Sequence, residues 1–131
     1  MFALALATDV PQFLLAYDLW FYLAHRALHI PWIYKRYHYQ HHAHLHPPWH
    51  HTFVAHVAEN VVSGLGLLLP LAWKRSINAL CVAWVVCLVR GVARHDVRCA
   101  WLVGAHHLHH HVSPGKNFSA FYIDWLFGTA L

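Results

Sequence analysis

Histidines gathered into three dense groups constrain this chain more than any other feature. The sequence holds 16 histidines in 131 residues, far more than ordinary packing needs. The first group is His25 and His29, the second runs from His38 to His42, and the third is the run His106-His-Leu-His-His-His111. Most of these spacings direct several imidazoles to one side of a helix, as a metal site requires. We therefore expect the remaining chain to be a scaffold that brings the groups together.

The composition predicts an all-α fold of one domain, residues 1–131, in the form of an integral membrane helical bundle. Hydrophobic residues make up 59% of the chain and charged residues 11%, whereas about a quarter of a soluble domain is charged. A soluble domain of this size and composition would expose large apolar patches. The net charge of +4 forms no basic run of the nucleic-acid-binding type, so we expect no nucleic acid partner. The three cysteines lack a CxxC pattern, which predicts reduced, buried thiols.

Three apolar helices are expected. Pro11 is predicted to start the first, over residues 12–29; the second runs from about 52 to 73 and the third from about 77 to 92. Between the first two, the aromatic and His-rich residues 31–51 indicate an interfacial segment. The purely apolar parts of the second and third helices, 61–73 and 77–89, are shorter than the roughly 20 residues of a full span. They either span with polar ends at the interface or form a hairpin that enters the bilayer partway.

The histidine-bearing helix ends are expected to meet on one side of the membrane. Lys74 and Arg75 fall on the opposite side. The other basic residues that lie near the histidines are Arg26, Lys35, Arg36, Arg90, Arg94, Arg98 and Lys116. The positive-inside rule then places the histidine cluster in the cytosol, at the endoplasmic reticulum in a eukaryote or the inner membrane in a bacterium. Residues 1–10 lack the basic start of a cleavable signal peptide.

The first helix carries a polar stripe of Asp18, Tyr22, His25 and His29. Histidines at i and i+4 can bind one metal from one helix face. Asp18, two turns earlier, could hold a ligand imidazole by its ring N–H or bind the metal directly. The alternative is a buried polar stripe that packs against another helix. An aspartate in an apolar span is costly without a partner, which favours the functional interpretation.

Two HxxHH patterns extend the predicted site. On a helix, His38, His41 and His42 point at one locus. The last group holds the same pattern twice, as His106, His109 and His110 or as His107, His110 and His111, and the sequence leaves both registers open. Alone, such a run could be a surface metal-sequestering tract, but its repetition in one apolar chain favours a metal site.

Other histidines carry weaker signals. His56 and Glu59 are spaced i, i+3, and the pair either has a ligand or near-ligand role or caps and polarises the start of the second helix. His95 follows the third helix and, taken alone, indicates an interfacial residue. The remaining histidines share no consistent helical spacing. We interpret them as interfacial or access-path residues: His44, His46, His50 and His51.

Many neutral imidazoles with few carboxylates make Fe, Zn, Cu and Ni the candidate metals. The ligands outnumber what one ion can use, so two ions are expected. A two-metal, His-rich site that faces lipid favours oxygen activation by iron. A zinc hydrolase would need an electrophilic substrate, which nothing in the sequence indicates.

Taken together, these motifs resemble a known family. The stretch 18–29, followed by His38-x-x-His41-His42, is similar to the opening motifs of the fatty acid hydroxylase / sterol desaturase superfamily. Residues 53–59 resemble its His-Pro-x-acid segment, with Val57 where proline is usual. Arg94-His95-Asp96 and the tail, with Lys116–Ser119 and Asp124–Thr129 after the last HxxHH, complete the order of motifs over residues 16–129.

The resemblance implies a membrane-bound enzyme with two non-haem iron ions. It would use O2 and two electrons from a haem protein or reductase to hydroxylate, desaturate or demethylate a lipid, sterol or fatty acyl chain. By match, the ligands are His25, His29, His38, His41, His42, His95 and the last HxxHH in either register. The distance to Asn117 slightly favours the register that begins at His107. Asp18, Asn117 and Asp124 are implied as supporting residues.

Members of the family are usually about twice this length and carry an upstream hydrophobic hairpin that is missing here. The chain is therefore a minimal member, a fragment, or one that forms a homo-oligomer to complete its lipid slot. One rival is a metal-handling or transport membrane protein without redox chemistry, which would place ionisable residues along a path across the bilayer. Another is a bis-histidine haem protein, which would place histidine pairs on facing helices inside the bilayer.

Overall fold

The computed structural model describes residues 2–131 and is built from helices, with no strand in that range. This confirms the predicted all-α class. The long elements are α1 (Phe2–Leu28) and α4 (Ile77–Arg94), together with α3 (Val57–Gly64), which continues into the 3-10 helix η4 (Leu65–Ala72). The short elements are α2 (Pro31–Ile33), η1 (Tyr34–His38), η2 (His41–Ala43), η3 (Trp49–Phe53), η5 (Val97–Cys99), α5 (Ala100–Val103), α6 (His106–Val112) and α7 (Phe121–Leu126).

The first helix begins earlier than predicted. Pro11 lies inside α1 instead of starting it, so that prediction was wrong. A proline in a helix interior removes one main-chain hydrogen bond and favours a bend. The flanking residues Phe2–Val10 are mostly strong helix formers, so the helix continues on both sides.

The predicted second helix, 52–73, is α-helical only over Val57–Gly64. It begins at Val57, because His56 is extended (ψ 140°) and its Nδ1 accepts the N–H of Ala58 as an N-cap. After Gly64 the chain tightens into η4, which contains Pro70. The third predicted helix is confirmed as α4, with Ser76 as its N-cap. The interfacial segment consists of short turns of helix from α2 to η3.

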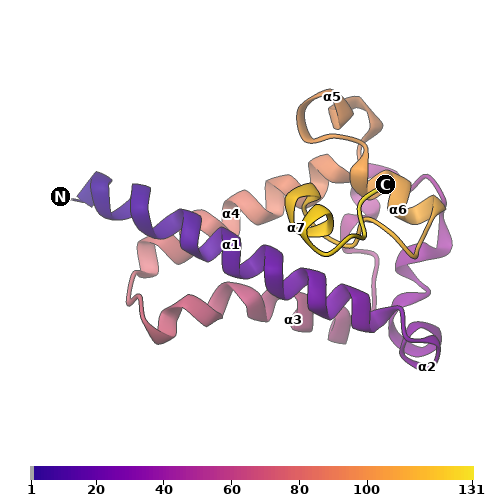
Figure 1. Ribbon diagram of the computed structural model, residues 1–131, viewed down its shortest axis with the longest axis horizontal. Coiled ribbons are helices and arrows are strands. Elements are labelled where there is room, and N and C mark those ends of the chain that lie inside the picture. The colour runs from indigo at the N-terminus through magenta and orange to yellow at the C-terminus, as the bar shows by residue number, and fades with distance from the viewer. Residues whose placement is uncertain (1) are drawn as a thin grey trace.

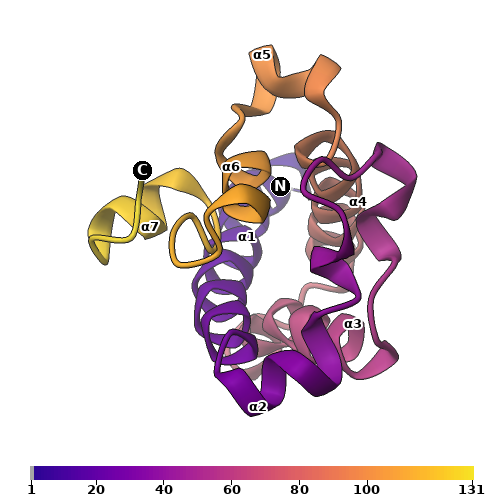
Figure 2. The ribbon, with the colours of Figure 1, turned by 90° about the vertical axis from the view of Figure 1, so that its right-hand side faces the viewer.

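The core lies where α1 crosses η4 and α4. Phe13 of α1, Leu67 of η4 and Ala79, Ala83 and Cys87 of α4 form its buried cluster. A second cluster packs Tyr22 of α1 against the C-terminal segment. All segments with the dense histidine groups gather at the end of the molecule away from the N-terminus (Figure 1). Figure 2 looks at that end, with α1, α3 and α4 behind and α6 and residues 31–55 around its face.

Within residues 2–131, α4 is the one helix long and apolar enough to cross a membrane. Only 17% of its 18 residues are buried. Val82, Trp84, Val85 and Val89 are exposed along the helix. The run Val57–Ala72 is apolar but shorter. A side of α4 that is apolar and uncovered fits contact with lipid.

Gly66 lies where η4 touches α1. A Cβ at this position would be 2.8 Å from Cβ of Trp20, which sits close to its own backbone and cannot swing away. We expect Gly66→Ala to lower the free energy of unfolding by about 1–3 kcal/mol through overpacking. Gly64→Ala is the matched control, because a Cβ there meets nothing within 4 Å. Thermal unfolding in detergent compares the two, and equal stability of both variants would contradict the close packing of η4 on α1.

Candidate metal centre

Nine histidines converge in two adjacent groups. The first consists of five residues, His25, His29, His38, His42 and His110; the second consists of four, His41, His95, His107 and His111. Within each group one ring nitrogen of every member lies within 4.8 Å of the others. These histidines come from the end of α1, the 38–42 segment, the end of α4 and α6, so only the folded chain brings them together.

The five-histidine group is closed by contacts between Nε2 atoms. His25 and His38 are 3.1 Å apart at these atoms, His29 and His38 3.2 Å, His29 and His110 3.1 Å, and His42 and His110 3.2 Å. Two nitrogens about 2.1 Å from one metal and at right angles are about 3.0 Å apart. The observed separations therefore match neighbouring ligands of a high-coordinate ion.

The four-histidine group has the same character. Nε2 atoms of His95 and His107 are 3.1 Å apart. Both ring nitrogens of His111 are buried without a hydrogen-bond partner, although a buried polar atom is costly when unpaired. A metal ion at this locus would take one of these nitrogens.

The two groups share a wall of adjacent imidazoles, one pair stacked and one pair tilted. Ring centroids of His38 and His41 are 5.3 Å apart, and those of His42 and His111 are 4.7 Å apart. In each pair one ring belongs to the first group and one to the second. The arrangement therefore offers two neighbouring metal positions.

The far nitrogens of several rings are held by the main chain. Nδ1 of His25 is 2.5 Å from the Phe118 carbonyl oxygen, Nδ1 of His110 is 2.6 Å from that of Lys116, and Nδ1 of His95 is 2.9 Å from that of Gly91. A carbonyl can only accept, so the proton in each ring sits on Nδ1 and Nε2 keeps its lone pair. Such partners fix the tautomer and orientation that a metal ligand needs.

Burial keeps these rings neutral. It lowers the pKa of His38 to about 2, of His111 to about 3 and of His110 to about 4, and neighbouring imidazoles add to the effect for His38 and His111. Neutral imidazoles are the form that binds metal. These histidines therefore do not need to release protons near neutral pH before they can bind a metal ion.

We expect the metal-free protein to lose stability as the pH falls from 7 to 5. The unfolded chain takes up protons on histidines near pH 6.5, whereas folded His38 and His110 stay neutral because their pKa values lie at about 2 and 4. The unfolded state then binds more protons, and each such histidine lowers the free energy of unfolding by up to about 1.4 kcal/mol per pH unit below that point. Urea unfolding of chelator-treated protein measures the slope, and a flat profile would contradict buried neutral rings.

The C-terminal segment is the frame behind the first group. Asp124 is fully buried and accepts the N–H groups of Phe118 at 2.8 Å and Ser119 at 2.7 Å and the Thr129 hydroxyl at 2.7 Å. Asn117 takes φ of 58° and its Oδ1 accepts the N–H of Leu131 at 2.8 Å. This left-handed conformation is one that asparagine tolerates. Together they hold the carbonyls that orient His25 and His110.

Several predicted site residues lie elsewhere. In α6 His110 belongs to the five-histidine group and His107 and His111 belong to the four-histidine group. His109 is exposed, and Nε2 of His106 lies 3.1 Å from Asp124. His56 is a helix cap outside both groups.

The expected role of Asp18 beside an imidazole was wrong. Its carboxylate accepts hydrogen bonds from Arg90 and, at 2.5 Å, from the Tyr122 hydroxyl. The carbonyl oxygen of Asp18 accepts the Ser119 hydroxyl at 2.7 Å. Asp18 therefore ties α1 to α4 and to the C-terminal segment. The spacing along α1 placed it on the histidine stripe, but two helical turns separate it from His25, and its carboxylate is taken up by Arg90 and Tyr122.

The sequence left open whether Glu59, paired with His56, lies near the metal centre or at the start of the second helix. The side chain is buried, with Oε2 2.9 Å from Nδ1 of His38. Its spacing from His56 was a visible signal, but it pointed to the wrong histidine.

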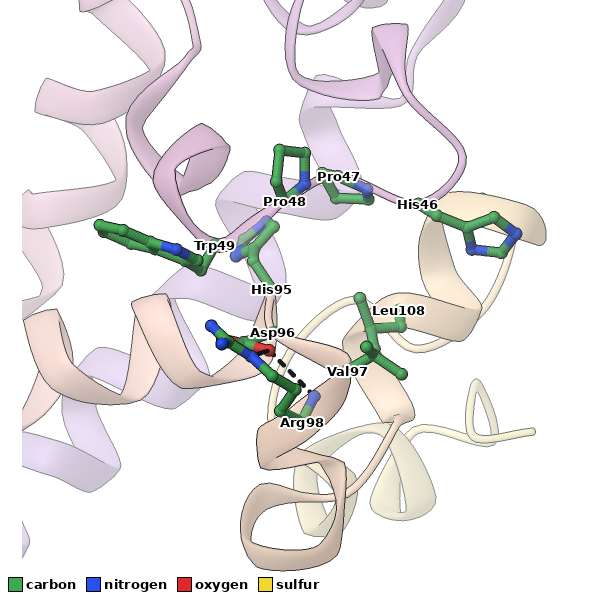
Figure 3. A pocket seen from close by; sticks show the side chains of 9 residues that line it. All are labelled: His46, Pro47, Pro48, Trp49, His95, Asp96, Val97, Arg98 and Leu108. Atoms are coloured by element: carbon green, nitrogen blue, oxygen red, sulfur yellow. Dashed lines mark hydrogen bonds and ion pairs between the residues drawn. The ribbon is translucent and has the colours of Figure 1, made fainter.

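Two cavities reach the centre. A cleft of about 290 Å³ is bounded by α1, α3 with η4, and α4, and its lining includes His25, His41, His95 and His107 with Phe21, Leu67 and Trp84. A second cavity of about 410 Å³ reaches His95 between Pro47–Trp49 and Asp96–Arg98, with His46 and Leu108 at its side (Figure 3). Ring atoms of the centre are therefore reachable from the largely apolar cleft and from this second cavity.

The donor set fits transition metals that accept imidazole, such as iron or zinc. The fit depends on the unpaired ring nitrogens of His111 and on the inward lone pairs of His25, His95 and His110. Comparison with curated proteins and with solved structures found no match for the chain. The sequence model of the fatty acid hydroxylase family, in contrast, matches residues 10–129. The match spans nearly the whole chain and includes all nine grouped histidines, so the chain belongs to the fatty acid hydroxylase family.

Proposed function

We propose that this protein is a membrane-bound non-haem di-iron oxygenase that hydroxylates, desaturates or demethylates a lipid, sterol or fatty acyl chain. The observation that carries the proposal is the pair of adjacent imidazole groups, five and four histidines, at the end of an apolar cleft. Family membership implies an oxygen-dependent lipid oxidoreductase in general.

The nine grouped histidines are the proposed ligands. Two irons held by them would activate O2 with two electrons from outside, so that a substrate C–H bond is oxidised and water is released. The chain supplies the cage of neutral rings and their fixed tautomers. Because His25, His41, His95 and His107 line the cleft, a bound chain would lie directly beside both metal positions.

The cleft supports an apolar substrate. Apart from the centre, Phe21, Leu67, Trp84 and Leu88 contribute to its wall, and none of its lining residues is lysine or arginine. Trp84 is exposed on α4, at the rim of this cleft and on the apolar side of the helix. We infer that substrate enters from the lipid phase between α3 and α4, with α4 in the bilayer, the histidine end in the cytosol and a haem protein or reductase as electron donor.

Metal analysis of detergent-purified protein, combined with lipid profiling of cells that express it, tests the proposal. We expect about two irons per chain and an oxidised lipid that is absent from cells expressing His41→Ala. The alternative is a metal-handling membrane protein that keeps the motifs without the chemistry. Zinc alone, or little metal with an unchanged lipid profile, would favour that alternative and contradict the oxygenase.

A further inference from the structure

Glu59 is the one acidic side chain in the described residues that lies within 4.0 Å of histidines from both groups. Its Oε2 is 2.9 Å from Nδ1 of His38, in the five-histidine group, and its Oε1 is 4.0 Å from Nδ1 of His41, in the four-histidine group. The residue sits in the first turn of α3 and is 7% exposed. Its carboxylate therefore lies behind the wall that the two groups share.

The carboxylate faces the outer nitrogens, not the metal positions. Nε2 of His38 is directed at Nε2 of His25 and His29, so Nδ1 is on the opposite edge of the ring. Glu59 consequently stands where the carbonyls of Phe118, Lys116 and Gly91 stand for other histidines, but it offers a side-chain carboxyl group where they offer main-chain carbonyls. A carboxylate partner raises the basicity of a metal-bound imidazole more than a carbonyl does.

Both sides of this contact lack an aligned hydrogen bond. Oε2 of Glu59 and Nδ1 of His38 and His41 are buried without one. A histidine that binds metal through Nε2 carries its remaining proton on Nδ1. That proton needs an acceptor in a ring that is fully buried, as His38 is. In the described chain Glu59 is the acid close enough to provide it.

We propose that Glu59 is a positioning residue that accepts the Nδ1 protons of His38 and His41 when these rings bind metal, and so couples the two metal positions. This inference rests on the proposed function in so far as both groups bind metal. It assigns to α3 a role in the centre although α3 contributes no ligand.

Metal release from loaded protein tests the coupling. The wild type, Glu59→Ala and Glu59→Gln are loaded with iron(II) under anaerobic conditions, and transfer to an excess of coloured chelator is followed for both ions. We expect Glu59→Ala to release both ions about 10–100-fold faster, because the loss of such a partner typically costs that factor in affinity. Glu59→Gln keeps an amide oxygen as acceptor and should recover part of the difference. Asn60→Ala, an exposed neighbour on α3, is the control and should match the wild type.

Melting temperatures separate positioning from a merely structural role. Without metal, Glu59 is a buried carboxylate with no aligned partner, so Glu59→Ala should leave the melting temperature of the metal-free protein unchanged or raise it. When metal is added, the melting temperature of Glu59→Ala should rise by less than that of the wild type. A lower melting temperature of metal-free Glu59→Ala, with unchanged release, would show a structural role and overturn the proposal.

The release kinetics also distinguish a failure of the proposed function from a failure of the coupling through Glu59. A wild type that holds no metal overturns the proposed function and this inference together. A wild type that retains two ions, with release from Glu59→Ala unchanged or faster for one ion only, overturns the coupling and leaves the proposed function standing.

Discussion

Replacing His110 with alanine should reduce the iron content from about two ions per chain to about one and lower turnover by more than about 100-fold. His110 is buried, and its Nε2 lies 3.1 Å from that of His29 and 3.2 Å from that of His42. Its removal opens the five-histidine group on one side. Loss of a hydrogen-bond partner behind a ligand lowers metal affinity or activity by about 10–100-fold. Loss of a ligand itself should lower them by more. Elemental analysis and a turnover assay measure the two effects.

His109→Ala is the matched control for this change. His109 is the preceding residue of the same helix, but it is exposed and belongs to neither group. We expect it to keep both irons and turnover close to that of the wild type. The pair also tests the register of the last HxxHH, because the alternative register would include His109. Two irons and normal turnover in His110→Ala would exclude the five-histidine group as a metal position.

Asp124→Ala should cost about 3 kcal/mol or more of the free energy of unfolding. The carboxylate is the only acceptor found for the buried N–H groups of Phe118 and Ser119 in the described chain. Each buried donor left unpaired costs about 1–3 kcal/mol, which is a large share of a total of about 5–15 kcal/mol. Phe118 also presents the carbonyl that orients His25, so metal affinity should fall as well. Urea unfolding in detergent gives the stability.

Asp9→Ala removes a carboxylate at the far end of α1. Asp9 is 3.0 Å from Nζ of Lys74, and the two side chains are 12% and 34% exposed. Lys74 can turn to solvent when its partner is removed, so the loss of this pair should cost about 1 kcal/mol. We expect a small change in stability and none in metal content. If Asp124→Ala destabilised no more than Asp9→Ala, Asp124 would not be the residue that holds the C-terminal segment.

The ligand types could be predicted from sequence because metal chemistry leaves a local signature. A histidine pair at i, i+4 and two HxxHH patterns place imidazoles on one side of a short helix wherever that helix lies. This local rule holds for His25 and His29 at the end of α1, which share one group. The HxxHH triads were expected to point at one locus each, but both are divided between the two groups, with His41 apart from His38 and His42 and with His110 apart from His107 and His111. The third apolar helix was also predictable from the local sequence, since its apolar run is unbroken and Ser76 caps it.

Features that depend on neighbours across the fold were not predictable in this way. Pro11 was expected to start a helix that in fact runs through it, and the second apolar segment becomes a 3-10 helix where Gly66 packs against Trp20. Asp18 and Glu59 were both visible as acids in apolar segments. Their partners, Arg90 and His38, are 72 and 21 positions away in the chain, and no spacing rule connects them.

The sequence by itself determined the residue types of the centre, the family of the chain and its helical, apolar character, because these depend on local periodicity and composition. Only the tertiary structure decided how nine histidines divide into five and four, which register of the last HxxHH takes part, and which groups hold the outer nitrogens. Those outcomes depend on the packing of α1, α4, α6 and the C-terminal segment, which brings together atoms up to 107 residues apart. The packing of the whole chain sets these long-range contacts, and no single segment sets them alone.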